Sequence, residues 1–262
     1  MRLSAILLTT VEEHANLLVA EGALTMSSVR SKTCIITFMG PVGVGKSTQM
    51  RLLEDHLKSE NVKVVKTFIK SSHGLAYVLG RLLLALGANE RVSYPDGFAR
   101  VYPRKDVVRG LFTLWSFLDT LSIAIKFFFT VYVPFSLGFT ILIEEGLLMT
   151  LHTYLVSFPS FFKTEPRVLP LLPSLLGWIV GKNHVNVVLD ATDEELGRRR
   201  IGRSYRQNEL PEYVNLQKKW IKRVNLGDTI IETTDDSVIE VHKKIVAALE
   251  KRRVHKCTLR SR

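Results

Sequence analysis

A glycine-rich loop that ends in a lysine and two hydroxyl residues constrains this chain more than any other feature. It reads Gly40-Pro41-Val42-Gly43-Val44-Gly45-Lys46-Ser47-Thr48 and fits the pattern G-x-x-x-x-G-K-[ST] at every fixed position. Residues 34–39 before it are apolar and β-branched, which predicts a buried strand. After it, Met50, Leu53 and Leu57 recur at helical spacing. Strand, glycine loop and helix are the context that this motif requires.

The loop predicts a site for the phosphates of ATP. Glycines let successive backbone N–H groups point inward and bind anions, and the following helix adds the positive end of its dipole. Lys46 is expected to reach the β- and γ-phosphates, and the Ser47 hydroxyl to bind Mg²⁺. A glycine turn with a chance lysine would match in about one chain in a hundred of this length. We therefore predict ATP and Mg²⁺ as cofactors, bound by residues 40–48.

Length and cysteine content leave room for one or two folded domains and favour a reducing compartment. The 262 residues are 46% hydrophobic, enough for the core of one α/β domain or two small ones. The two cysteines, Cys34 and Cys257, lie far apart and form neither a disulfide framework nor a metal spacing. A reducing compartment, and hence a cytoplasmic location, is the prediction.

Both termini differ in composition from the rest of the chain. The apolar run at residues 5–8 is too short for a secretory signal, so residues 1–30 are interpreted as an extension, or as a start-site artefact if translation begins at Met26. Part of the net charge of +11 lies in residues 251–262. This tail has no interleaved aromatic residue, so we favour a solvated basic segment over contact with nucleic acid or anionic lipid. The main domain is expected at residues 31–250.

Strands and helices are expected to alternate along this domain. The predicted strands cover residues 34–39, 62–69, 139–143, 185–189 and 229–231. The predicted helices follow the glycine loop and cover residues 75–86, 147–156, a short part of 168–180, two segments between 192 and 220, and 237–252. Residues 88–103 are expected to form a loop. Alternation of this kind predicts a parallel sheet wrapped by helices.

Residues 111–143 are apolar enough to suggest a transmembrane helix. Asp119 and Lys126 interrupt the first half, and Pro134 and Gly138 are expected to break the second. We favour a buried core helix, a turn and a strand, and predict no membrane span. A membrane-spanning helix is the alternative.

The segment from residue 32 to about residue 248 resembles the thymidylate kinase-like members of the P-loop nucleoside monophosphate kinases. The likeness rests on the glycine loop with Ser47-Thr48-Gln49, on residues 114–119, on residues 189–195 with the arginines that follow, and on residues 231–242. The resemblance implies a three-layer P-loop kinase fold, with a five-stranded parallel sheet in the order 2-3-1-4-5. It implies transfer from ATP to a nucleoside monophosphate, by default dTMP + ATP to dTDP + ADP. A homodimer is left open, and no specific nucleic-acid partner is implied.

Three positions depart from that family. The usual Asp-Arg pair after the third strand is replaced by Glu144-Glu145, and the arginine after the core-helix aspartate by Thr120. The turn after the second strand reads Lys70-Ser71-Ser72-His73 instead of Arg-Glu-Pro. These changes keep open the alternative of a degenerate nucleotide-binding protein without kinase activity. The apolar residues 111–143 keep open a second alternative, a membrane-associated ATPase.

The resemblance also suggests roles for individual residues. Residues 198–212 correspond to a lid, in which Arg199, Arg203 and Arg206 are the candidates to close over the γ-phosphate. Together with these arginines, we assign catalytic roles to Lys46 and Glu144.

Carboxylates at two strand ends are candidates for the metal. We assign Glu144 with Ser47 to Mg²⁺, against the alternative that Glu144 only ends a strand in solvent. For Asp190 we prefer a structural role over metal binding. Further candidates, for binding the acceptor phosphate, are Lys70, His73 and Arg109.

Overall fold

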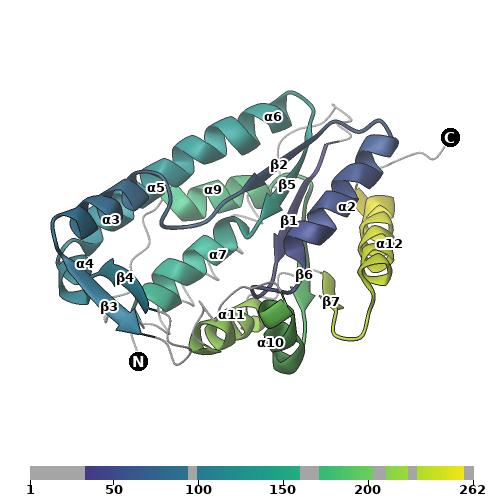
Figure 1. The fold of residues 1–262 in the computed structure, drawn as a ribbon. Coiled ribbons are helices and arrows are strands. Elements are labelled where there is room, and N and C mark those ends of the chain that lie inside the picture. The colour runs from purple at the N-terminus through teal and green to yellow at the C-terminus, as the bar shows by residue number, and fades with distance from the viewer. Residues whose placement is uncertain (1–32, 94–98, 160–170, 203–210, 224–228, 257–262) are drawn as a thin grey trace.

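The computed structural model describes residues 33–93, 99–159, 171–202, 211–223 and 229–256. A parallel sheet lies at its centre with helices on both faces (Figure 1). Its strands are β1 (Ile35–Met39), β2 (Val64–Phe68), β5 (Thr140–Glu144), β6 (His184–Asp190) and β7 (Thr229–Glu232). They lie in the order β2-β5-β1-β6-β7, all parallel. Counted along the chain this is 2-3-1-4-5, so the predicted fold and strand order are confirmed.

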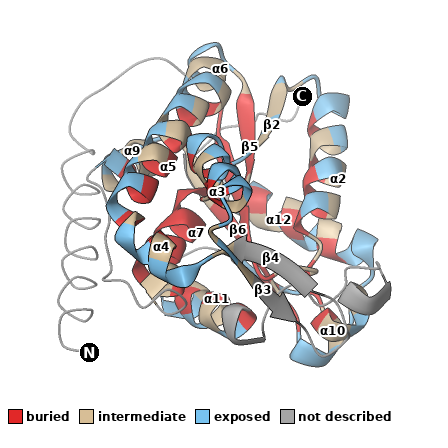
Figure 2. Ribbon diagram, turned by 60° about the vertical axis from the view of Figure 1, so that its left-hand side comes forward, coloured by how far each residue is buried: buried red, intermediate tan, exposed pale blue. Residues whose placement is uncertain are grey.

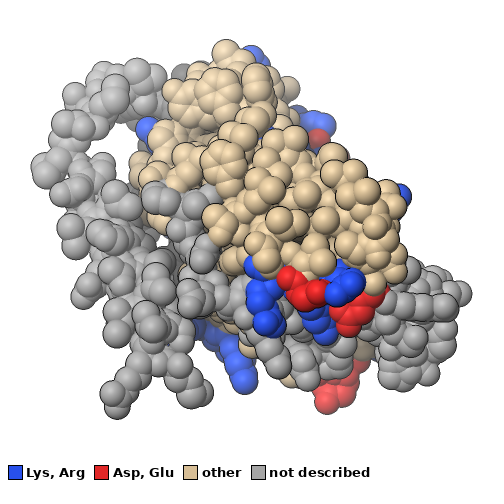
Figure 3. Space-filling view, turned by 90° about the vertical axis from the view of Figure 1, so that its left-hand side faces the viewer, with Lys and Arg blue, Asp and Glu red and all other residues tan. Residues whose placement is uncertain are grey.

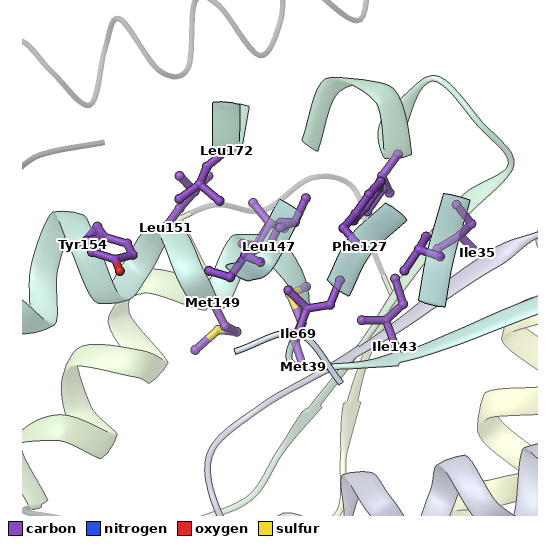
Figure 4. Packing of buried hydrophobic residues seen from close by; sticks show 14 of the residues in the cluster. Ile35, Met39, Ile69, Phe127, Ile143, Leu147, Met149, Leu151, Tyr154 and Leu172 are labelled. Atoms are coloured by element: carbon purple, nitrogen blue, oxygen red, sulfur yellow. The ribbon is translucent and has the colours of Figure 1, made fainter. Parts of the chain in front are cut away.

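Alternate residues of the central strand β1 face two separate cores. Ile35 and Met39 pack with helices α5 (Phe112–Phe127), α7 (Gly146–His152) and α9 (Leu171–Val180) in the cluster seen in Figure 4. Ile36 and Phe38 pack on the other face against α2 (Lys46–Ser59) and α12 (Val238–Lys256). A strand covered on both faces is apolar throughout, which explains why residues 34–39 show no polar alternation.

The remaining elements surround this framework. They are α3 (Leu75–Ala85), α4 (Lys105–Gly110), a π-helical turn η2 (Thr153–Ser157) after α7, α10 (Asp193–Gly202) and α11 (Pro211–Arg223). Helix α12 continues to Lys256, so the first part of the predicted basic tail is helical. The predicted N-terminal extension lies outside the described residues, as do residues 257–262 and most of the predicted lid.

A single long helix replaces the helix and turn expected between residues 111 and 138. It runs from Phe112 to Ser136 as α5, a π-helical turn η1 (Phe128–Tyr132) and α6 (Val133–Ser136). The expected break at Pro134 is wrong, because the wider π-helical turn before it accommodates a residue that has no N–H and a bulky ring. The chain turns at Gly138, which has a φ of 87°.

This helix is also less buried than a core helix should be. It is the one helix among the described residues that is long and apolar enough to cross a membrane, and 39% of its apolar window is buried. One side packs on the sheet through Ile123 and Phe127, whereas the opposite side faces outward (Figure 2).

The loop expected at residues 88–103 is wrong as well. Strands β3 (Asn89–Ser93) and β4 (Ala99–Pro103) form a separate antiparallel hairpin. Residues 91–93 and 99–102 alternate poorly in hydrophobicity, so the pattern gave little indication of strands.

Candidate active site

The glycine loop joins the carboxyl end of β1 to the first turn of α2. Gly40, Gly43 and Gly45 have φ angles of 143°, 91° and 104°, a region that residues with a side chain rarely adopt. At Gly40 the reason is also steric, because a Cβ atom there would lie 2.2 Å from the carbonyl oxygen of Leu189. The loop therefore curls tightly against β6, and residues 46–48 follow as the first turn of α2.

The side chain of Lys46 lies against the loop from which it emerges. Its Nζ donates hydrogen bonds to the carbonyl oxygens of Gly40 and Pro41, at 2.8 and 3.1 Å. The carboxylate of Glu145 lies 3.9 Å away. Only 6% of Lys46 is exposed, so its ammonium group is held against the loop and away from solvent.

Ser47 and Glu144 meet beside this lysine. The Ser47 hydroxyl donates a hydrogen bond of 2.7 Å to Oε1 of Glu144, the last residue of β5. Strand β5 lies next to β1, with Glu144 opposite Phe38, and this pairing brings its carboxylate to the loop. A hydroxyl and a carboxylate oxygen are ligands that suit Mg²⁺, which commonly takes one or two protein ligands and completes its shell with phosphate oxygens and water. The residues present thus fit the metal, although the described residues include no group of three or more acidic, His or Cys side chains that could hold one.

Glu145 is a member of the site that the sequence did not single out. Its φ and ψ of 69° and −56° lie in the γ-turn region, which is sparsely populated for residues with a side chain. Its N–H bonds the carbonyl oxygen of Phe38 at 2.9 Å, which keeps the turn at the end of β5. The carboxylate lies between Lys46 and Lys70, at 3.9 and 3.5 Å from their Nζ atoms. In the sequence, the one indication that Glu145 belongs to the site is that two consecutive glutamates follow an apolar strand.

A buried carboxylate organises the turn after β2. Asp119 of α5 is fully buried and accepts hydrogen bonds from the backbone N–H groups of Ser72 and His73, at 2.9 and 3.3 Å. The hydroxyl of Tyr154 in η2 donates to the same carboxylate. Burial raises the pKa of Asp119, while these hydrogen bonds act in the opposite direction. The sequence marked Asp119 as part of the family resemblance, but not as the residue that holds this turn.

The candidate acceptor residues take different positions. Lys70 is brought to the loop through Glu145. His73 is exposed, and its ring folds back onto its own turn. Nδ1 lies 2.9 Å from the carbonyl oxygen of Ser71, and the ring makes a T-shaped contact with the ring of Phe68. Arg109 is exposed in the last turn of α4. Of the three, Lys70 is the one that shares a charged partner with Lys46.

Arg199 binds the outer side of the glycine loop. From α10 its guanidinium donates to Glu195 at 2.6 Å, to the Thr233 hydroxyl at 3.0 Å and to the carbonyl oxygen of Val44 at 3.4 Å. Arg198 binds the same glutamate but is 79% exposed. Hydrogen bonds from Arg198 and Arg199 lower the pKa of Glu195 to about 2. Arg203 and Arg206 lie outside the described residues.

Asp190 has structural partners at the end of β6. Its Oδ1 accepts a hydrogen bond of 2.9 Å from the N–H of Ala191 and lies 3.6 Å from Nζ of Lys218. Lys218 also donates to the carbonyl oxygen of Ala191 at 2.7 Å. These contacts join β6 to α11 and agree with the structural role that the sequence favoured.

Comparisons with known proteins find similarity in structure alone. No family model matches the chain, and no curated protein matches it in sequence. The thymidylate kinase from Ehrlichia chaffeensis is 18% identical with a TM-score of 0.47, and the match covers 83% of this chain and 98% of that one. The thymidylate kinase from Candida albicans is 14% identical with a TM-score of 0.51, covering 90% of this chain and 98% of that one. With the sheet order and the glycine loop described above, the chain has a thymidylate kinase-like fold.

Proposed function

We propose that this protein is a cytoplasmic kinase that transfers the γ-phosphoryl group of ATP to a nucleoside monophosphate, with dTMP as the first acceptor to test. The proposal rests on one observation, the Ser47 hydroxyl at 2.7 Å from the Glu144 carboxylate beside the buried Lys46. These are the oxygen ligands and the cation that a metal-bound triphosphate needs, and they lie at one end of a glycine loop.

The groups around the loop would act mainly by position and charge. Backbone N–H groups of residues 42–48 and Lys46 would hold the triphosphate, since phosphoryl transfer asks for orientation and for stabilisation of negative charge. Ser47 and Glu144 would bind Mg²⁺, which, when bound, neutralises charge on the β- and γ-phosphate oxygens. Lys46 is already enclosed by the loop carbonyls and by Glu145, so its position is fixed before the nucleotide enters.

Other roles are proposed for basic residues around the loop. Arg199 would hold the outer rim of the glycine loop through the carbonyl oxygen of Val44. Arg203 and Arg206 are proposed for the γ-phosphate. Lys70, next to Glu145, is proposed to grip the acceptor, with His73 and Arg109 as further candidates.

A second candidate is a nucleotide-binding protein that does not transfer phosphate. Two observations favour it. The Glu145 carboxylate lies 3.9 Å from Lys46 on the acceptor side, where it would repel an acceptor phosphate. Thr120 is 2% exposed, so no cation enters the site from that position.

Coupled ADP release across a panel of nucleoside monophosphates tests the proposal. We expect acceptor-stimulated release that Lys46→Ala lowers by about a hundredfold or more, as removal of one group that stabilises transition-state charge does. Lys58→Ala is the matched control, because Lys58 lies on the same helix, is 56% exposed and pairs with Glu54. ATP binding without any acceptor-stimulated turnover would refute the kinase and support the second candidate. Hydrolysis independent of every acceptor would point to an ATPase.

A further inference from the structure

The carboxylate of Glu145 lies between the donor and the acceptor sides of the site. The side chain is 13% exposed. Its Oε1 lies 3.9 Å from Nζ of Lys46, and its Oε2 lies 3.5 Å from Nζ of Lys70. Both distances are longer than those of an N–H···O hydrogen bond, so the lysines place charge near the carboxylate without occupying its lone pairs. Both oxygens can therefore still accept a hydrogen bond from a substrate.

The backbone around Glu145 fixes the position of this carboxylate. Its φ of 69° is rare for a residue with a side chain, and its N–H donates to the carbonyl oxygen of Phe38 at 2.9 Å. Gly146 follows with a φ of 72°, and a Cβ atom there would lie 2.7 Å from Cγ2 of Thr37. The turn is thus held against β1 at two successive residues. Strained residues held in this way cluster at sites that bind or transform ligands.

The charges on the acceptor side of the site oppose one another. A phosphate group is bound best by cations, and a nearby carboxylate repels it. In the turns after β2 and β5, Lys70 faces Glu145. The ring of His73 folds back onto its own turn, and Thr120 is buried. These segments therefore offer the phosphate of an acceptor one lysine and one opposing carboxylate.

Carboxylates also accompany the cations farther out, around α4. Nη2 of Arg104 lies 2.5 Å from Oδ2 of Asp106, and Nζ of Lys105 lies 4.0 Å from Oε1 of Glu90. Figure 3 faces this side of the molecule and shows basic and acidic side chains together along the lower edge of a largely uncharged surface. An acceptor without a negative charge fits such surroundings better than a doubly charged phosphate does.

We propose that the site also transfers the γ-phosphoryl group to the 5′-hydroxyl of a nucleoside, with Glu145 as the catalytic base. The inference rests on the proposed use of ATP at the glycine loop. Because Lys46 is to contact the β- and γ-phosphates, a carboxylate 3.9 Å from its Nζ lies next to the group in transfer. A hydroxyl acceptor has a proton to lose, and protein kinases use a carboxylate to accept it. An uncharged nucleoside is also not repelled by Glu145.

The step is a displacement at the γ-phosphorus of ATP. The 5′-oxygen of the nucleoside forms a bond to this phosphorus while the bond from phosphorus to the β,γ-bridging oxygen breaks, and the electron pair of that bond leaves with ADP. The hydroxyl proton passes to the Glu145 carboxylate and from there to water. The products are a nucleoside monophosphate, ADP and a proton. This monophosphate belongs to the class of acceptor in the proposed function.

Chromatographic analysis of the products tests this activity. The full-length protein is incubated with ATP, Mg²⁺ and either a panel of nucleosides or the matching monophosphates, and we expect a monophosphate to form from a nucleoside. Glu145→Gln keeps the size of the side chain but removes the base, and should lower kcat with the nucleoside by about a hundredfold. Turnover of the monophosphate should not fall, because the variant removes a repelling charge. A purely structural role of Glu145 would lower both activities together.

The matched control is Glu54→Gln on α2. The Glu54 side chain is 14% exposed and also lies between two lysines, Lys58 and Lys66, but it is two helical turns beyond Lys46. This variant should turn over both classes of acceptor at the wild-type rate, and circular dichroism melts would check that each variant folds.

The two classes of acceptor separate this inference from the proposed function. Wild-type turnover of monophosphates alone would refute the nucleoside activity and leave the proposed kinase in place. Turnover of nucleosides alone would support the inference and refute the monophosphate kinase, and absence of turnover with both classes would refute both. Equal losses with the two acceptors in Glu145→Gln would refute the role of Glu145 as the base.

Discussion

At the scale of single residues, the hydroxyl of Ser47 is the group whose removal should be most specific. Ser47→Ala deletes one oxygen ligand next to Glu144 and leaves the loop and Lys46 in place. We expect kcat to fall by about a hundredfold, with an increased Mg²⁺ requirement, because loss of one metal ligand weakens the charge stabilisation of the transition state.

Titration of the turnover rate with Mg²⁺ measures this effect. Ser59→Ala is the matched control, since Ser59 ends the same helix and its hydroxyl binds the carbonyl oxygen of His56. If Ser47→Ala kept the wild-type rate and Mg²⁺ dependence, the metal would not be bound at Ser47 and Glu144.

Glu145 shows where residue patterns stop being informative. The sequence indicated that two consecutive glutamates follow the strand, and we chose Glu144 for the metal, next to which the structure places Ser47. Nothing in the pattern indicated that the backbone would turn at a φ of 69°, because that angle depends on the N–H of Glu145 reaching Phe38 on the neighbouring strand. The position of its carboxylate between two lysines follows from that turn.

At the scale of elements, Arg199 joins α10 to the glycine loop through the carbonyl oxygen of Val44. Arg199→Ala should raise KM for ATP by about tenfold, because the hydrogen bonds to Val44 and Thr233 that fix the rim would be lost. Arg198→Ala is a close control, since the neighbouring arginine binds the same Glu195 but is 79% exposed. Steady-state kinetics at saturating acceptor measure the difference. Equal effects of the two variants would show that the contact with the loop is irrelevant.

Helix α5 and the turn after β2 are coupled through Asp119. Asp119→Asn keeps the shape but replaces one acceptor oxygen by an amide donor, which leaves Ser72 or Tyr154 without its partner. We expect KM for the acceptor to rise several-fold, KM for ATP to stay unchanged, and the free energy of unfolding to fall by about 1–3 kcal/mol.

Tyr154→Phe separates stability from positioning. It removes the hydroxyl that donates to Asp119 but leaves the two backbone hydrogen bonds to the turn. This variant should lose stability with little change in KM for the acceptor. A rise in KM for ATP in Asp119→Asn would contradict a role confined to the acceptor turn.

The elements that the sequence predicted well are those that are indicated by residues close together in the chain. Strand β1 and helix α2 follow from apolar runs and spacing on either side of the glycine loop. The helix Phe112–Ser136 was shortened in our prediction, because a proline normally ends a helix and the π-helical turn that accommodates Pro134 leaves no pattern in the sequence. The hairpin of β3 and β4 was missed, since Pro95-Asp96-Gly97 between the strands dominated the composition of the segment.

At the scale of the whole molecule, the sheet order determines which residues can form one site. β5 inserts between β2 and β1, so the turns after these three strands meet at one edge and bring Lys70, Glu144 and the glycine loop together. Parallel sheets of this kind place ligands beyond the carboxyl ends of their strands. The order itself was predicted only through the family resemblance, because pairing between distant strands leaves no local signal.

Stability of the whole fold should depend on pH through one buried histidine. His152 of α7 is fully buried, and burial lowers its pKa to about 4, although a backbone hydrogen bond with Leu216 and the charge of Glu145 oppose this shift. An unfolded histidine has a pKa of about 6.5, so between these two values the unfolded chain binds a proton that the folded protein does not. The contribution is therefore present above pH 6.5 and is lost as the pH falls toward 4. At pH 5 the free energy of unfolding should have dropped by about 2 kcal/mol from this residue alone.

Urea unfolding of wild type and His152→Gln at pH 7.5 and pH 5 measures this contribution. The variant should be less stable at pH 7.5, since it disturbs a site packed against Trp220 and hydrogen-bonded to Ser157. Its stability should nevertheless change less between the two pH values, by about 2 kcal/mol, because the buried imidazole of His152 is no longer there to be protonated on unfolding. His56→Gln, which removes a surface imidazole near Glu60, should retain the wild-type pH dependence because His152 is still present. An unchanged pH dependence in His152→Gln would mean that the proton uptake on unfolding comes from other groups. Asp119 would not be one of them, because its raised pKa makes the folded protein the better proton binder and shifts stability in the opposite direction.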